Sequence, residues 1–226
     1  MRQAVSRTVG IRRASVLSGL VLAFGLLAAP VASQIRPEPA PDPDGEAHAI
    51  ARTVTAAEVA AWARENRDAE AMMVAARMLS DVRMRPSNGD APFLTSEALL
   101  VEAEALAGGD TELQARISRL RSPNKGVRAS PFGQGPIVVV RRLRARETYG
   151  FAIEARRNEV LRVAAIGDGD TRIDLILRDR SGAVVCAGGA GDHYPVCTVA
   201  RPQSGTLRIE VVNRGEVWSR VQIMTN

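Results

Sequence analysis

The sequence predicts an α+β protein in which short helical hairpins are followed by an antiparallel β-sandwich. Three observations predict this order. Residues 46–121 are rich in Ala, Glu, Arg, Leu and Met, and their apolar members recur at helical spacing. From residue 137 to residue 226 the apolar residues alternate with polar ones, in short runs separated by turn residues. A Pro- and Gly-rich segment at residues 122–136 is predicted to link these two regions.

The N-terminus has the three parts of a secretory signal peptide. A basic segment ends at Arg13, an apolar run covers residues 16–29, and small residues follow up to Ser33. We predict a signal peptide over residues 1–33, cleaved near Ser33, and hence a periplasmic or secreted protein with no stable membrane insertion. An uncleaved anchor is the alternative, although the apolar run is shorter than the ~20 residues that span a bilayer.

Residues 34–45 follow, with four prolines interleaved with acidic residues, and predict an extended tether. The capping-box pattern at residues 55–58 predicts that the first helix begins at Ala56. The caps of the next three helices are predicted at Asp68, at Thr95 or Ser96, and at Asp110. Short connections between these helices indicate two helical hairpins.

The strands are predicted from runs of alternating or continuous apolar residues. These runs cover residues 137–143, 149–153, 160–166, 173–177, 207–211 and 217–224. About seven strands at this spacing are typical of an antiparallel sandwich.

Two cysteines, Cys186 and Cys197, lie in the β region. An exported chain meets an oxidising compartment, where paired cysteines form disulfides. The bond would close a loop of about 12 residues, worth roughly 3 kcal/mol. A metal site or a catalytic thiol is the alternative, and each would depend on His193, the histidine within reach. We predict the disulfide.

Three segments of the β region carry a family resemblance. Residues 167–175 read GDGDTRIDL, residues 179–182 read DRSG, and residues 204–213 read SGTLRIEVVN. In this order they resemble the bacterial pre-peptidase C-terminal domain family, over about residues 137–226. The resemblance implies a jelly-roll-like β-sandwich that accompanies secreted proteins, often hydrolases, and assists secretion, localisation or binding. Arg172 departs from the acidic residue usual in that pattern, and Ile176 from the aromatic one.

Five residues are candidates for a binding site. Asp168, Asp170 and Asp174 could supply oxygen ligands to calcium, but Arg172 lies among them, and the alternative is a polar turn with Asp174 facing solvent. We expect no cofactor or metal, with calcium the one left open. His193 and Tyr194 lie between the two cysteines and would form a contact surface on the disulfide loop.

Composition limits the function. The net charge of +5 falls to +1 once residues 1–33, with four arginines and no acidic residue, are removed, so the mature chain lacks the basic footprint of a nucleic-acid binder. Neither H-E-x-x-H nor G-x-S-x-G occurs, and we predict no catalytic residues. The sequence therefore favours a non-enzymatic module that binds a protein or polysaccharide of the cell envelope. The alternative is a small secreted hydrolase, or an accessory subunit of one, that uses carboxylates.

Overall fold

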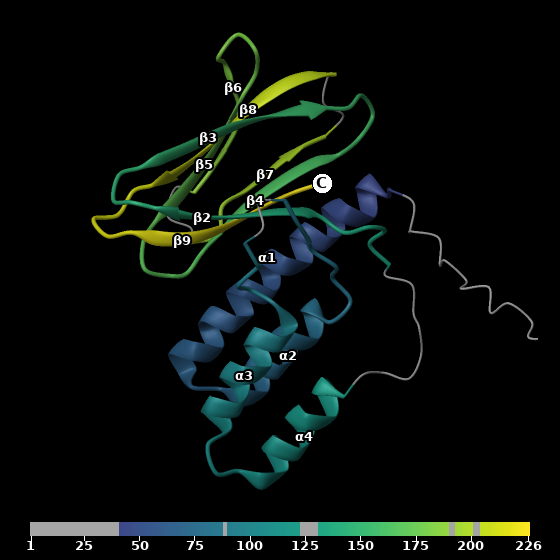
Figure 1. The fold of residues 1–226 in the computed structure, drawn as a ribbon, viewed down its shortest axis with the longest axis vertical. Coiled ribbons are helices and arrows are strands. Elements are labelled where there is room, and N and C mark those ends of the chain that lie inside the picture. Colours follow the sequence, from purple (N-terminus) through teal and green to yellow (C-terminus); the bar gives the residue numbers. More distant parts are fainter. Residues whose placement is uncertain (1–40, 88–89, 123–130, 190–192, 201–203) are drawn as a thin grey trace, which may run out of the picture. The chain divides into compact units, whose positions relative to one another are not determined.

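The computed structural model describes residues 41–226, except residues 88–89, 123–130, 190–192 and 201–203. Helices α1 to α4 precede most of the strands, and the strands form two sheets, so the predicted α+β class is confirmed (Figure 1). The predicted signal peptide and residues 34–40 of the tether lie outside the described residues.

The helices are α1 (Pro43–Asn66), α2 (Ala69–Leu79), α3 (Ser96–Ala107) and α4 (Thr111–Arg121). Three of the predicted N-caps are confirmed. The side chains of Asp68, Thr95 and Asp110 accept hydrogen bonds of 2.9, 3.1 and 3.0 Å from the backbone N–H three residues further on. Each bond satisfies a donor that the first turn of a helix leaves without an intrahelical partner.

The first helix begins at Pro43, so the prediction that it begins at Ala56 was wrong, and the end of the predicted tether is helical. Asp42 caps it and accepts a bond of 3.0 Å from the N–H of Gly45. Pro is favoured at the first helical position, because the N–H that it lacks would have no partner there. Thr55 lies in mid-helix instead, and its hydroxyl donates to the carbonyl oxygen four residues earlier.

The strands are β1 (Arg85–Pro86), β2 (Ile137–Leu143), β3 (Thr148–Ala155), β4 (Leu161–Gly167), β5 (Ile173–Arg178), β6 (Val184–Gly188), β7 (Val196–Val199), β8 (Gly205–Asn213) and β9 (Ser219–Thr225). One sheet has five strands in the order β1-β2-β9-β4-β7, and the other has four in the order β3-β8-β5-β6. Neighbouring strands are antiparallel except for the short β1, which pairs parallel with β2. The predicted antiparallel sandwich is confirmed.

The core between the sheets follows from the alternation seen in the sequence. Every second side chain of β5 is buried, and β8 turns its own alternate residues to the same side. The largest side chains of this core are those of Leu143, Ile173, Leu175, Leu177, Ile209 and Ile223.

The helical region packs on the outer face of the five-stranded sheet through α1. Helix α1 lies against β4 and β9 (Figure 1). Val138, Val140, Ala164, Ile166 and Met224 of that sheet belong to the same hydrophobic core as the helical side chains. The helices and the sandwich therefore share a core, although the sequence predicts a linker between them at residues 122–136.

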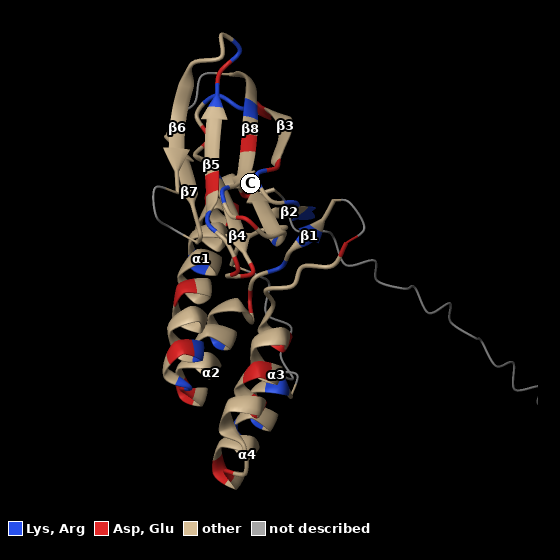
Figure 2. Ribbon diagram, turned by 90° about the vertical axis from the view of Figure 1, so that its left-hand side faces the viewer, with Lys and Arg blue, Asp and Glu red and all other residues tan. Residues whose placement is uncertain are grey.

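Acidic and basic residues are interspersed along the helices. In Figure 2 acidic and basic residues are mixed along the helices, and ion pairs such as Arg64 with Glu102 and Arg121 with Glu104 join neighbouring helices. None of the helices in the described part of the chain is long and apolar enough to cross a membrane.

The predicted disulfide is present. It joins Cys186 on β6 to Cys197 on β7, with the two Cα atoms 5.9 Å apart. These strands form the edges of the two different sheets, so the bond clips the sandwich along one side. A structural disulfide of this kind fits an extracellular or periplasmic protein.

Candidate binding surface at the loop end

Three turns meet at one end of the sandwich. They are residues 144–147 between β2 and β3, residues 168–172 between β4 and β5, and residues 214–218 between β8 and β9, and together we call them the loop end. The turns that follow β2 and β8 lie side by side in Figure 1. The fully buried Asn213 holds these two, because its side-chain N–H group donates to the carbonyl oxygens of Leu143, Arg144 and Val217 at 3.3, 3.0 and 2.8 Å.

The third turn is tied to the same place. The carboxylate of Asp168 accepts hydrogen bonds from the hydroxyl of Ser219 at 2.7 Å and from the N–H of Arg220 at 2.8 Å. The N–H of Arg214 donates to the carbonyl oxygen of Arg172 at 2.8 Å. All three turns are therefore fixed to one another by bonds that cross between them, which gives the surface a defined backbone.

Two large apolar side chains are exposed on this fixed backbone. Val217 is 52% exposed and Trp218 is 54% exposed. The guanidinium carbon of Arg142 lies 5.5 Å from the centre of the Trp218 ring, within reach of a cation–π interaction. Arg146 forms an ion pair with Glu216 beside them. An exposed tryptophan and arginine within a charged rim match the composition of protein-binding hot spots.

The sequence did not identify Trp218 as a site residue, because residues 217–224 read as one strand. The structure begins that strand at Ser219 and leaves Val217 and Trp218 in the preceding turn. A large aromatic three residues after the turn residues 213–215 was the signal present in the sequence.

The predicted acidic residues are at or beside the loop end, and two of them have structural partners. The carboxylate of Asp168 binds Ser219 and Arg220, and that of Asp174 accepts a bond of 2.6 Å from the Nε of Arg214. Asp170 is exposed on its turn. In the part of the chain that the structure describes, no three His, Cys, Asp or Glu side chains are grouped so that they could hold a metal ion.

The structure separates the surroundings of His193 and Tyr194. His193 is exposed, and its Nδ1 lies 3.3 Å from the carbonyl oxygen of Thr171 at the loop end. Tyr194 is half-buried against the helical core. It lines a small cavity of about 250 Å³ together with Asp168 and the ion-paired Arg64 and Glu102. Burial raises the pKa of the Tyr194 hydroxyl above its usual value of 10.0, as expected for a phenol turned away from solvent.

No family model matches the chain, and no curated protein matches it in sequence. Solved structures to which it is similar include the pre-peptidase C-terminal domain of a collagenase from Bacillus anthracis, at 9% identity and a TM-score of 0.36, covering 39% of this chain and 87% of that one.

Two further solved structures are similar over the same share of their own length. One is PliG, a periplasmic inhibitor of g-type lysozyme from Aeromonas hydrophila, at 14% identity and a TM-score of 0.31, covering 40% of this chain and 86% of that one. The other is the CBM36-1 domain of a multidomain xylanase from the hindgut metagenome of Trinervitermes trinervoides, at 17% identity and a TM-score of 0.25, covering 46% and 86%.

Proposed function

We propose that this protein is an exported, non-catalytic binding module that holds a protein partner of the cell envelope through its loop end. The observation that carries the proposal is the exposure of Val217 and Trp218 on three turns that are bonded to one another. A preformed surface avoids the entropic cost of ordering loops when a partner binds. A desolvated tryptophan is among the side chains that contribute most to such interfaces.

Binding is favoured over catalysis by what the polar groups at this end do. The carboxylates of Asp168 and Asp174 are occupied by Ser219, Arg220 and Arg214. Both cysteines are joined in the disulfide and offer no thiol nucleophile. These two carboxylates thus support the turns rather than facing a substrate.

A protein partner is favoured over a polysaccharide by the kind of surface that surrounds Trp218. Arg142 lies over its ring, and the ion pairs of Arg146 with Glu216 and of Arg214 with Asp174 form a charged rim. Tyr149 on β3 is half-buried, and the guanidinium carbon of Arg141 lies 5.0 Å from the centre of its ring. It therefore offers no second platform for a sugar ring. An apolar centre with a polar rim is the usual anatomy of a protein interface.

Export is proposed from the tripartite N-terminus at residues 1–33 and is supported by the disulfide. The mass of the mature protein tests it, since cleavage near Ser33 removes Met1 and the four N-terminal arginines. A mature chain that retains them would show an uncleaved anchor.

Site-specific photo-crosslinking in intact cells tests the binding surface. A photoreactive amino acid at Val217 should capture one recurrent protein, whereas the same group at Val74 on α2 should not, although both positions are 52% exposed. Trp218→Ala should weaken capture about tenfold or more, and Trp62→Ala, which removes an equally exposed tryptophan from α1, should leave it unchanged. Three results would overturn the proposal. The two tryptophan variants could weaken capture equally, or the protein could be retained on a polysaccharide and capture no protein. The third is hydrolytic turnover that is lost on mutating one Asp or Glu.

A further inference from the structure

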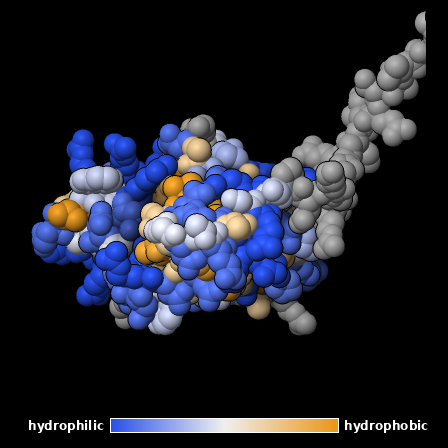
Figure 3. Space-filling view, turned by 90° about the horizontal axis from the view of Figure 1, so that it is seen from below, coloured by the Kyte–Doolittle hydropathy of each residue, from blue (hydrophilic) through white to orange (hydrophobic). Residues whose placement is uncertain are grey.

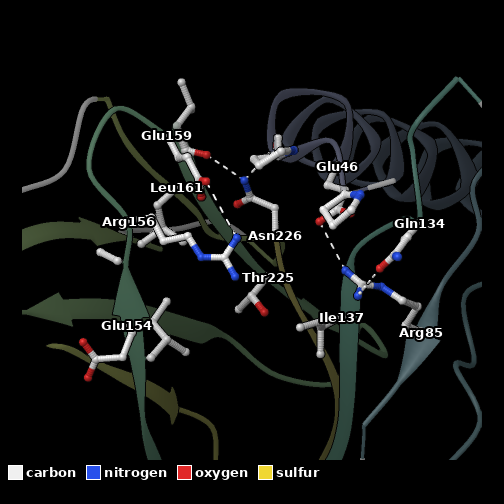
Figure 4. A pocket seen from close by; sticks show the side chains of 15 residues that line it. Glu46, Arg85, Gln134, Ile137, Glu154, Arg156, Glu159, Leu161, Thr225 and Asn226 are labelled. Carbon is white, nitrogen blue, oxygen red and sulfur yellow. Dashed lines mark hydrogen bonds and ion pairs between the residues drawn. The ribbon is translucent and has the colours of Figure 1, made fainter. Parts of the chain in front are cut away.

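A second site lies at the opposite end of the sandwich, where β2 and β4 begin and β3 and β9 finish. The first turn of α1 borders it, and the hollow has a volume of about 450 Å³. We call it the terminal cleft. Figure 4 shows side chains from these elements around it, among them Glu46, Arg85, Ile137, Glu154 and Glu159. Ile153 lines the cleft as well.

Glu46 is the unusual group of the terminal cleft. Its side chain is 5% exposed, and its Oε2 lies 3.2 Å from the Nη2 of Arg85 (Figure 4). Its other oxygen, Oε1, is buried and has no hydrogen-bond partner. A buried carboxylate oxygen without a donor carries the full cost of losing its water. That loss of water raises the pKa of Glu46 above its ordinary value of 4.5, and Arg85 offsets part of the rise.

Arg85 and Asn226 beside Glu46 donate hydrogen bonds to other acceptors. The Nε of Arg85 donates to the carbonyl oxygen of Gly135 at 2.7 Å, and its Nη1 donates to Gln134 at 3.0 Å. The side-chain N–H group of Asn226 donates to the carbonyl oxygens of Pro43 and Val160 at 2.9 and 2.6 Å. Glu46 Oε1 keeps no hydrogen-bond donor from these side chains, and a molecule that enters the cleft can supply one.

Charge and shape define the class of that molecule. Three glutamates and two arginines line the cleft, namely Glu46, Glu154, Glu159, Arg85 and Arg156, so a cation is favoured. A guanidinium binds a carboxylate best through both oxygens, but Arg85 already holds Oε2, whereas a compact ammonium binds fully through one. Ile137, Ile153 and Leu161 supply aliphatic walls for an apolar stem.

We propose that the terminal cleft binds a primary ammonium group on an aliphatic stem, with Glu46 Oε1 as the acceptor of its N–H. The side chain of a lysine and a free alkylamine share this chemistry. The site is separate from the loop end, so either site can exist without the other.

NMR titration of the mature chain with Nα-acetyl-lysine N-methylamide tests the proposal. Amide signals of Glu46, Ile137 and Ile153 should shift with this probe and not with the norleucine analogue, which keeps the stem and lacks the amine. Glu46→Gln should weaken the lysine probe about tenfold or more, because it removes a charge-assisted bond. Glu65→Gln, at an exposed position of the same helix, should bind as the unaltered chain does.

Three results would overturn the proposal: equal shifts with the lysine and norleucine probes, undiminished binding to Glu46→Gln, or no shift in the cleft at millimolar probe. If Glu46→Gln does not fold, the comparison of the two probes on the unaltered chain decides alone. Butylamine distinguishes the source of the amine. Weaker binding of butylamine than of the lysine probe indicates a lysine within a peptide, and equal binding indicates a free amine.

Discussion

The side-chain oxygen of Gln222 on β9, the middle strand of the five-stranded sheet, accepts a hydrogen bond of 3.1 Å from the N–H of Leu94. The N–H of Phe93 donates to the same oxygen at 3.0 Å. Gln222 is fully buried, and the segment between α2 and α3 has no strand or helix of its own at this point. One side-chain amide on the sheet thus satisfies two backbone donors of the helical region and fixes the position of the segment between α2 and α3 on the sheet.

Gln222→Leu should therefore destabilise the protein by about 2–4 kcal/mol, because two N–H groups would lose their acceptor at a buried position. Urea unfolding measures the change. Gln114→Leu is the matched control, since Gln114 bonds two carbonyl oxygens near the exposed start of α4 and should cost less than about 1 kcal/mol. Similar losses for the two variants would mean that the bond to Leu94 does not join helices and sheet.

The shared core gives a second prediction. A fragment of residues 137–226 would expose the outer face of the five-stranded sheet, with Val138, Val140, Ala164, Ile166 and Met224. Since apolar burial is the main favourable contribution to folding, the fragment should unfold at lower urea concentration than the mature chain and should bind a hydrophobic dye. Circular dichroism follows both transitions. Equal midpoints would show that the sandwich is complete without the helices, as composition alone suggested.

Local signals in the sequence predicted local structure well. Side-chain caps at Asp68, Thr95 and Asp110 and the alternation in residues 173–177 correspond to the elements that formed. The predicted start of α1 was wrong because the capping-box sequence pattern at residues 55–58 also occurs inside a helix, as it does here. Asp42 and Pro43 provide a better start, since Pro43 has no N–H to satisfy.

The packing between elements was harder to foresee, although one signal was present. Residues 160–166 form a nearly continuous apolar run, which is typical of a strand covered on both faces, and β4 is indeed buried along most of its length. The candidate site also depended on tertiary contacts. Asp168 and Asp174 were chosen as chemically active types, but their partners Ser219 and Arg214 come from a distant part of the chain. Glu46 gave no local signal, because its burial arises from contacts with the sheet.

The disulfide supplies a third prediction. Cys186→Ala combined with Cys197→Ala should lower the free energy of unfolding by about 3 kcal/mol, because the unfolded chain regains the freedom of the loop that the bond closes. Urea unfolding of the double variant measures the loss, and reduction of the unaltered protein should give a similar value. A loss below about 1 kcal/mol in both would mean that β6 and β7 hold the two sheet edges together without the bond.

The last prediction concerns the pH dependence that Glu46 imposes. Burial raises the pKa of this carboxyl in the folded chain, and the charge of Asp42 adds to the rise. The charge of Arg85, the backbone hydrogen bond of Asp42 and the charge of Arg156 oppose it. As pH rises through 4.5, the Glu46 carboxyl ionises in the unfolded chain before it does so in the folded chain. The free energy of unfolding therefore falls as pH rises from about 4.5 to the pKa of Glu46 in the folded chain. Above that pKa the carboxyl is ionised in both states and causes no further change. Glu46→Gln removes this loss. Relative to the unaltered chain, the variant should therefore become more stable between pH 4 and pH 7.

Urea unfolding of both proteins at intervals from pH 4 to pH 7 measures this difference. The comparison with Glu65→Gln is needed because other carboxylates titrate over the same range. Glu65 is exposed on α1, so its variant should follow the unaltered chain at every pH. If the advantage of Glu46→Gln shrinks as pH rises, the ionised carboxylate is stabilised in the folded chain. In that case Arg85 outweighs the lost hydration, and Oε1 has a donor that the buried geometry does not show.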